Sequence, residues 1–244
     1  MEHELWPTRL LNDYLAGPAN DVLSLVRVHA ENPARPWANY VAMQVLVALF
    51  IVVVFAVLRP RLSMDKPGKT QHLLEIIYQF LREQSEEVAG HEGPKFLAYF
   101  TTIFVFILFA NLIGMIPSFE SPTMYIYVTV GCALVTFVYY HLVGIQAKGI
   151  GKYILSFAGP QWYLAVLFFP IEIISHLGRP LSLSVRLYAN MFAGEKVTQI
   201  FIDLTYIVLP VLFMGLHVFV AFLQAYVFTL LTMMYVGQAV SHEH

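Results

Sequence analysis

The sequence predicts an all-α, polytopic membrane protein with about five membrane-crossing helices and one amphipathic surface helix. Its 244 residues are 58% hydrophobic and only 12% charged, and the mean hydropathy of the chain is +0.66. Soluble domains carry about twice that share of charge. Several apolar stretches reach about 20 residues, which suffices to cross a hydrocarbon core of about 30 Å. No repeat or soluble segment divides the chain, so we expect residues 1–244 to form a single membrane domain.

Composition excludes several classes of function. The chain has 14 Lys and Arg against 16 Asp and Glu, so it lacks the basic surplus of a nucleic-acid-binding protein. It has no glycine-rich phosphate loop, and no nucleotide is expected to bind directly. Cys132 is the only cysteine and lies in an apolar run, which favours a packed core thiol over a metal ligand. We therefore predict neither a cofactor nor a metal site.

The N-terminal part combines a mixed segment with the first apolar span. Residues 1–36 mix charged and apolar positions, and we expect them to form a short interfacial helix or two outside the cytoplasm. Residues 37–58 are the first expected transmembrane helix, with Trp37 and Tyr40 at its start, where aromatic side chains favour the membrane interface. Four cations follow this span: Arg59, Arg61, Lys66 and Lys69. The positive-inside rule places them in the cytoplasm and the N-terminus outside.

The middle of the chain predicts a surface helix and two further spans. Residues 70–89 place apolar side chains at helical spacing among glutamates and arginine, which is typical of an amphipathic helix on the membrane surface. Residues 96–117 form the second expected transmembrane helix and return to the outside. Residues 125–144 form the third, and Lys148 and Lys152 follow it in a predicted cytoplasmic loop.

The last two helices are too long for an upright crossing. Residues 161–201 and 209–238 each contain about 30 residues of helical character, or about 45 Å of helix, against a hydrocarbon core of about 30 Å. We expect them to form a steeply tilted hairpin whose turn lies near residues 203–209. Counting crossings then places the C-terminus in the cytoplasm. The candidate positions for kinks are Pro180, Gly194 and Gly215.

Arg186 stands in the middle of the first hairpin helix, where a charge is costly. An arginine at the centre of a bilayer costs from about 3 to more than about 10 kcal/mol, so such a residue normally faces protein or water. At about 100° per residue, Ser182 and Asn190 share its face, with Glu172 close beside it. Glu195 follows nine residues after Arg186 and points about 180° away.

The second hairpin helix carries a shorter polar stripe. His217 and Gln224 are seven residues apart and share a face. On the first helix, Glu172 and Glu195 lie about 21 Å and 14 Å from Arg186 along the axis, toward the cytoplasm and the outside respectively. Arginine stays charged, whereas glutamate and histidine exchange protons. The sequence therefore predicts two proton half-paths, one from each side, separated by a fixed positive charge.

Three motifs in the apolar helices carry a family resemblance. Residues 182–195 read Ser-Leu-Ser-Val-Arg-Leu-Tyr-Ala-Asn-Met-Phe-Ala-Gly-Glu, and residues 216–226 read Leu-His-Val-Phe-Val-Ala-Phe-Leu-Gln-Ala-Tyr. A weaker motif at residues 111–117 reads Asn-Leu-Ile-Gly-Met-Ile-Pro. Together they resemble subunit a of the F-type ATP synthases, the stator channel that faces a rotating ring of c subunits. The resemblance covers roughly residues 70–244.

The resemblance implies a role for each polar residue. Arg186 would be the essential arginine that faces a carboxyl group of the ring. Glu195, His217 and Gln224 would belong to the outer half-channel, and Glu172 to the inner one. Two polar neighbours would complete the arginine face: Asn190 and Ser182.

The implied function is proton translocation through two offset half-channels, coupled to rotation of the c-subunit ring in ATP synthesis or hydrolysis. The implied partners are the c-subunit ring, the peripheral-stalk b subunits, the rest of the ATP synthase and the lipid of a bacterial plasma membrane. ATP chemistry would belong to partner subunits. At about 4 Å and an effective dielectric constant of about 20, Arg186 would attract a ring carboxylate by about 4 kcal/mol, which favours release of its proton.

Alternative interpretations exist for single residues and for the chain. Glu195 is alternatively a helix-end residue paired with Lys196, and Glu172 a solvated charge near the interface. Arg179 is expected to extend to the cytoplasmic headgroups. For the chain, the alternative is a secondary cation/proton transporter, a class that usually shows internal repeats. A membrane scaffold without transport would leave the polar stripes unexplained.

Overall fold

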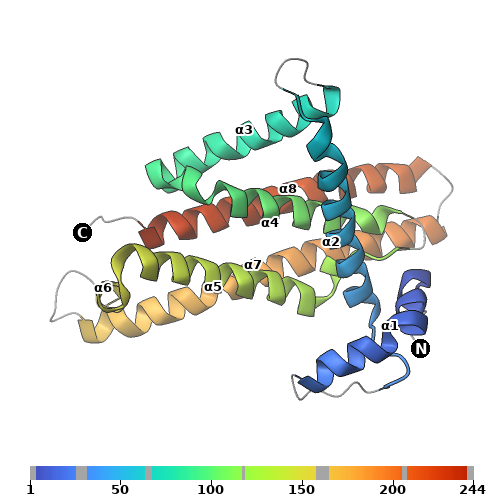
Figure 1. The fold of residues 1–244 in the computed structure, drawn as a ribbon, viewed down its shortest axis with the longest axis horizontal. Helices are drawn as coiled ribbons and strands as arrows, with labels where there is room; N and C mark the ends of the chain where they lie inside the picture. Colours follow the sequence, from blue (N-terminus) through green and yellow to red (C-terminus); the bar gives the residue numbers. More distant parts are fainter. Residues whose placement is uncertain are drawn as a thin grey trace.

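The computed structural model describes residues 4–25, 32–63, 68–116, 119–157, 165–204 and 208–240, and every regular element within these ranges is a helix (Figure 1). The α-helices there are α1 (Trp6–Leu25), α2 (Asn39–Leu58), α3 (Lys69–Ala89), α4 (Leu97–Leu112), α5 (Ile126–Lys148), α6 (Ile150–Ser156), α7 (Ala165–Leu204) and α8 (Val208–Val240). Short 3-10 helices are η1 (Arg59–Arg61), η2 (Gly90–Phe96), η3 (Ile113–Met115) and η4 (Pro122–Met124). The predicted all-α class is confirmed.

Four helical segments of the described residues are long and apolar enough to cross a membrane. They are Asn39–Leu58, Lys69–Met115, Ile126–Lys148 and Val211–Val240. The second of these joins the expected surface helix, α3, to the expected span, α4. The fifth expected crossing, α7, is not among these segments of the described residues. The expected ends of two helices, residue 117 and residues 161–164, lie outside the described residues.

The longest helices run across α2 rather than beside it. In Figure 1, α4, α5, α7 and α8 extend alongside one another, whereas α2 crosses them. α4 packs on α8, α5 packs on α7 and α8, and α7 packs on α8. The 40 residues of α7 and the 33 of α8 correspond to about 60 Å and 50 Å of helix, so an upright crossing does not accommodate them. α4 and α5 therefore run in the same direction as this hairpin.

The core lies where α4, α5, α7 and α8 meet. Lipid chains are as apolar as leucine, so these helices associate through close packing and hydrogen bonds more than through exclusion of water. The largest side chains that are almost fully buried include Phe100, Phe104, Tyr140, Leu187 and Phe228. α2 lies at the periphery, since only 17% of its most apolar window is buried. The rest of its surface is left to face lipid or a partner.

Local sequence accounts for the breaks between helices. Gly90 ends α3 with a φ of 69°, and Gly149 separates α5 from α6 with a φ of 79°, conformations that glycine adopts without steric cost. α7 continues through Pro170 and Pro180, each of which removes one backbone hydrogen bond. α7 ends at Leu204 and α8 begins at Val208, and residues 205–207 of the expected hairpin turn lie outside the described residues.

The N-terminal segment packs against the start of α2. Its helix α1 is divided at Leu15, whose φ of −122° and ψ of 17° are not helical, so one or two short helices describe it equally well. Asn12 donates to the Trp37 carbonyl oxygen at 3.2 Å and accepts the Trp37 backbone N–H at 2.9 Å. Trp6 packs edge-on against Phe119, three residues before η4 begins, with ring centroids 5.7 Å apart. Residues 1–3 and 26–31 lie outside the described residues.

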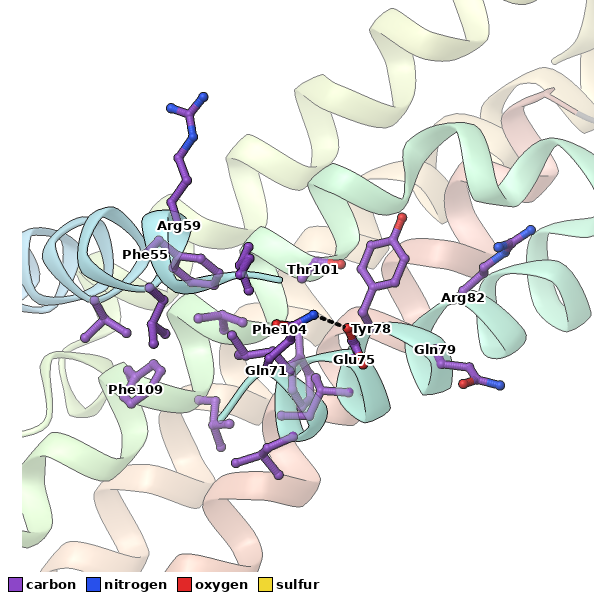
Figure 2. A pocket seen from close by; sticks show the side chains of 18 of the residues that line it. Phe55, Arg59, Gln71, Glu75, Tyr78, Gln79, Arg82, Thr101, Phe104 and Phe109 are labelled. Atoms are coloured by element: carbon purple, nitrogen blue, oxygen red, sulfur yellow. Dashed lines mark hydrogen bonds between the residues drawn. The ribbon is translucent and has the colours of Figure 1, made fainter. Parts of the chain in front are cut away.

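A groove of about 1380 Å³ opens between the end of α2, α3 and α4 (Figure 2). Its walls are mainly apolar, with Phe55 from α2 and Phe104 from α4 among the lining residues. Its polar side belongs to α3, where Gln71 donates a hydrogen bond of 2.8 Å to Glu75. The groove contains none of the residues that the sequence singles out for chemistry, so it is separate from the candidate functional site.

Candidate functional site

α7 presents a polar face that the rest of the chain leaves uncovered. Ser182, Arg186 and Asn190 are exposed, as the helical spacing predicts, whereas Leu183 and Leu187 on the other side are almost fully buried. Among the described residues, Arg186 has no ion-pair partner and no side-chain hydrogen bond. A permanent cation is thus displayed on an open surface of a helix at the centre of the hairpin.

The polar face of α7 is joined to α8 by a hydrogen bond. Asn190 Nδ2 donates to Gln224 Oε1 at 2.7 Å. Gln224 is only 4% exposed, and its Nε2 group is buried without a hydrogen-bond partner in the described structure. A buried donor without a partner is costly, and a water molecule or a proton path is a common reason for one. The arginine face therefore connects to a polar position inside the hairpin.

Glu195 lies on the opposite side of α7 from Arg186 and is only 9% exposed. The backbone amide of Ser121 hydrogen-bonds its carboxyl group, and Lys196 and Glu120 act on it electrostatically. Its Oε2 atom is buried with no hydrogen-bond partner in the described structure. The alternative interpretation of Glu195 as a helix-end residue is wrong, because α7 continues to Leu204.

His217 of α8 packs against the residue that precedes Glu195. A Cβ atom placed on Gly194 would lie 2.7 Å from His217 Nδ1, so only glycine leaves room for the ring. His217 also hydrogen-bonds the backbone of Gly194 and is 8% exposed. Glu195 of α7 and His217 of α8 both exchange protons, and they thus lie at the same level of the hairpin.

A buried hydrogen-bond network supports this end of the hairpin. Asn111 of α4 donates to the Ala221 carbonyl oxygen of α8 at 3.2 Å and accepts a hydrogen bond of 2.7 Å from Thr123. The hydroxyl groups of Thr123 and Ser121 are 2.7 Å apart, and Ser121 donates to the Ala110 carbonyl oxygen at 2.9 Å. Because the amide of Ser121 contacts Glu195, the network fixes the backbone that faces this carboxyl group.

A second polar cluster forms near the start of α7. Glu172 Oε1 lies 3.2 Å from His176 Nε2, and Tyr140 Oη lies 2.9 Å from His176 Nδ1. Arg179 Nη2 lies 4.0 Å from Glu172 Oε1, and the guanidinium group of Arg179 lies 5.0 Å from the ring centre of Tyr235. The expectation that Arg179 extends to the headgroups is therefore wrong, since its side chain is 17% exposed and turned toward α5 and α8. Glu172 is 40% exposed and so is only partly solvated.

The described residues contain no group of three or more His, Cys, Asp or Glu side chains arranged to hold a metal ion. Cys132 is buried as expected for a core thiol.

Comparison with known proteins decides the family. A sequence model described as "ATP synthase A chain" matches residues 41–237, a range that includes Arg186 and all other candidate residues. The chain belongs to the ATP synthase subunit a family. The ATP synthase subunit a of Solibacter usitatus is 60% identical over 235 residues, which cover 96% of this chain and 100% of that protein. The one from Koribacter versatilis is 47% identical over 244 residues and covers 100% of both chains.

Membership of the subunit a family confirms the resemblance carried by the three motifs. It identifies the chain as an integral protein of a bacterial membrane that serves proton transport in ATP synthesis, rather than as a secondary transporter. The family match begins at residue 41, but the similarity to the Koribacter protein extends through the N-terminal segment. A third subunit a, from Syntrophotalea carbinolica, is 42% identical over 199 residues, covering 82% of this chain and 84% of that protein.

Two polar residues of this subunit a were not found by sequence reasoning. These residues, His176 and Tyr140, belong to the cluster around Glu172. One signal was available, because His176 follows Glu172 by four residues and this spacing brings helical side chains together. Tyr140 gave no such signal, since its contact with His176 joins α5 to α7.

Proposed function

We propose that this subunit conducts protons through two offset half-paths and couples their flow to rotation of a ring of c subunits. The observation that carries the proposal is the position of Arg186, an exposed cation without a partner in the described chain. An unpaired charge in a membrane is costly, so an external partner of opposite sign is expected. A carboxylate from a neighbouring chain supplies that charge.

The two half-paths approach this arginine from opposite sides. The outer one contains Glu195, His217 and Gln224, and the inner one begins at Glu172. Ser182 and Asn190 provide polar surface beside Arg186. This assignment is supported by the burial of Glu195 on the face opposite Arg186 and by the partly exposed carboxyl group of Glu172.

Arg186 separates the half-paths because it cannot pass a proton on. A ring carboxyl group is neutral in lipid and loses its proton beside Arg186, where the attraction is about 4 kcal/mol at about 4 Å and an effective dielectric constant of about 20. The proton leaves by one half-path, the ring turns, and the next carboxylate is loaded from the other. The membrane potential contributes about 2.3 kcal/mol per charge per 100 mV, so several protons are needed for each ATP.

The proposal includes an orientation and a set of partners. The N-terminus lies outside and the C-terminus in the cytoplasm, in agreement with the cations that follow the first span. The partners are the c-subunit ring, the peripheral-stalk b subunits and the remaining subunits of the enzyme. The chain binds no nucleotide, and ATP chemistry takes place elsewhere in the complex.

The test is Arg186→Ala in the whole enzyme, with ATP-driven acidification of inverted membrane vesicles as the measurement. Loss of the attraction of about 4 kcal/mol between Arg186 and the ring carboxylate predicts a fall in coupled pumping of up to about a thousandfold. The amount of subunit a in the complex should not change. Arg82→Ala is the matched control, because Arg82 is an exposed cation on α3 whose ion-pair partner among the described residues is Glu86 of its own helix. Coupled pumping at the wild-type rate in Arg186→Ala rules the mechanism out.

A further inference from the structure

The Glu172 cluster contains an ordered series of three hydrogen-bonding groups. Its outer end is Glu172, whose side chain is 40% exposed. His176 comes next with a side chain that is 12% exposed, and Tyr140 ends the series with an exposure of 1%. The two contacts of the imidazole use different ring nitrogens, Nε2 toward Glu172 at 3.2 Å and Nδ1 toward Tyr140 at 2.9 Å. A histidine held at both nitrogens has a fixed ring orientation.

We propose that His176 carries protons in the inner half-path as the direct partner of Glu172. The inference rests on the proposed function, because it names a second proton-carrying group for the inner half-path. Without a partner, Glu172 exchanges protons only with the cytoplasmic water. The neighbouring imidazole gives this carboxyl group a place to deliver its proton inside the protein.

The transfer needs no group beyond those present. When Nδ1 carries the ring hydrogen and donates it to Tyr140 Oη, the lone pair of Nε2 faces Glu172. The proton of a neutral Glu172 then crosses to Nε2, so that an O–H bond breaks and an N–H bond forms. The products are a carboxylate and an imidazolium, which remain paired at 3.2 Å. The reverse step returns the proton to the carboxyl group.

Every element around His176 contributes to this environment. α5 contributes Tyr140 and His141, whose ring centre lies 5.2 Å from that of His176. The ring centre of Phe157, which follows α6, lies 4.8 Å from that of His176. α6 also contributes Tyr153, which contacts His141 and Phe157, and α8 contributes Tyr235, which contacts Tyr140.

Arg179 of α7 is the one permanent cation that faces the cluster among the described residues. It contacts Glu172 at 4.0 Å and acts electrostatically on His176. Because like charges repel, a proton that reaches His176 is repelled by the guanidinium group of Arg179. Lys148 and Lys152, on α5 and α6, make no hydrogen bond or ion pair with His176 in the described structure. The arrangement favours transfer over storage of the proton.

The experiment compares His176→Gln with His72→Gln in the complete enzyme. Glutamine replaces both hydrogen bonds of His176, since its amide group donates to Glu172 and its oxygen accepts from Tyr140, but it cannot carry a proton. His72 is the matched control, because its Nδ1 atom also faces a carboxylate of its own helix, Glu75 at 4.0 Å, but its side chain is exposed on α3, away from the cluster. Proton flux through membrane vesicles is measured against the pH on the cytoplasmic side.

We expect His176→Gln to lower the flux at least about tenfold and to shift the pH of half-maximal flux by more than about one unit. His72→Gln is expected to match the wild type in both respects. A reduced flux with an unchanged pH profile in His176→Gln indicates a structural role and overturns the proposal, as does an equal shift in His72→Gln. If His176→Gln does not assemble, Tyr140→Phe replaces it, and a wild-type pH profile in that variant also overturns the proposal.

Arg186→Ala, measured in parallel, separates this inference from the proposed function. Normal coupled pumping in Arg186→Ala contradicts the rotary mechanism whatever the histidine variants do. Loss of pumping in Arg186→Ala together with wild-type behaviour of His176→Gln contradicts the role of His176 alone.

Discussion

Asn190 and Gln224 connect the two long helices through a hydrogen bond of 2.7 Å, four residues along α7 from Arg186. One partner is exposed on the polar face of α7, whereas the other is buried in α8. The bond therefore fixes the rotation of the arginine-bearing face relative to α8. The Nε2 group of Gln224 remains available inside the hairpin.

The first prediction concerns this hydrogen bond. Asn190→Leu leaves the Oε1 atom of buried Gln224 without its donor, and Gln224→Leu removes the acceptor of Asn190. A buried group that loses its partner costs about 1–3 kcal/mol, whereas replacing both partners by apolar groups is nearly neutral. We expect Asn190→Leu to lower the temperature at which the purified complex releases subunit a, and the double variant to recover part of this loss.

Gln199→Leu is the control for that measurement, because Gln199 is an exposed residue of α7 whose side chain contacts only Lys196 among the described residues. A change within about 0.5 kcal/mol is expected for it. Strictly additive losses in the double variant argue against a direct Asn190–Gln224 bond.

The second prediction concerns Asn111, which joins α4 to α8 and to η4. Asn111→Leu removes a hydrogen bond to the Ala221 carbonyl oxygen and the acceptor of Thr123. Both remaining groups are buried, and each loses one hydrogen bond at about 0.5–1.5 kcal/mol, since Thr123 keeps its bond with Ser121. The release temperature of subunit a should therefore fall in this variant.

Thr102→Val serves as the control for Asn111→Leu. Thr102 is exposed on the same helix, and its hydroxyl bonds only the Ala98 carbonyl oxygen of its own helix among the described residues, at 2.7 Å. A wild-type release temperature in Asn111→Leu means that the network does not hold the helices together.

The helices and the arginine face were predictable because they depend on local sequence. Apolar runs of membrane length define α2 and α8, and a rotation of about 100° per residue places Arg186 and Glu195 on opposite faces of α7. Arg179 shows the limit of this reasoning. Its long side chain was expected to extend to the headgroups, yet it turns inward against the rings of Tyr140 and Tyr235.

Contacts between distant segments could not be predicted from the sequence. The amide of Ser121 meets Glu195 only because the turn before α5 folds against α7, and neither residue has a local pattern that predicts the other. His176 and Tyr140 are separated by 36 residues. Such pairs follow from helix packing, which depends on the shapes of many side chains at once.

The third prediction tests Glu195 as a proton-carrying group. Glu195→Gln keeps the size of the side chain and its contact with the Ser121 amide but removes the ionisable group. We expect an intact complex whose ATP-driven pumping falls at least about a hundredfold, the lower range for loss of a positioned proton-transfer group. Glu120→Gln is an informative comparison, because Glu120 accepts a hydrogen bond of 2.8 Å from Tyr125 and need not titrate for the mechanism. Pumping in Glu195→Gln within a factor of two of the wild type contradicts the outer half-path.

The fourth prediction uses the close approach of His217 to Gly194. In Gly194→Ala the new methyl group lies 2.7 Å from His217 Nδ1, so the imidazole must move away from Glu195. Overpacking of this kind typically costs about 1–3 kcal/mol. We expect both a lower release temperature of subunit a and slower ATP-driven pumping.

A matched control and a compensating change distinguish this contact from a general effect of alanine in α7. Gly178→Ala introduces the same methyl group where nothing lies within 4 Å, and alanine favours a helix over glycine by about 1 kcal/mol, so its release temperature should not fall. Gly194→Ala combined with His217→Ala removes the ring that collides with the methyl group. The combined variant should regain thermal stability but not pumping, because the space is restored while the imidazole is absent. If it regains neither, the cost of Gly194→Ala arises elsewhere than at His217; if it regains pumping as well, His217 has no part in the outer half-path.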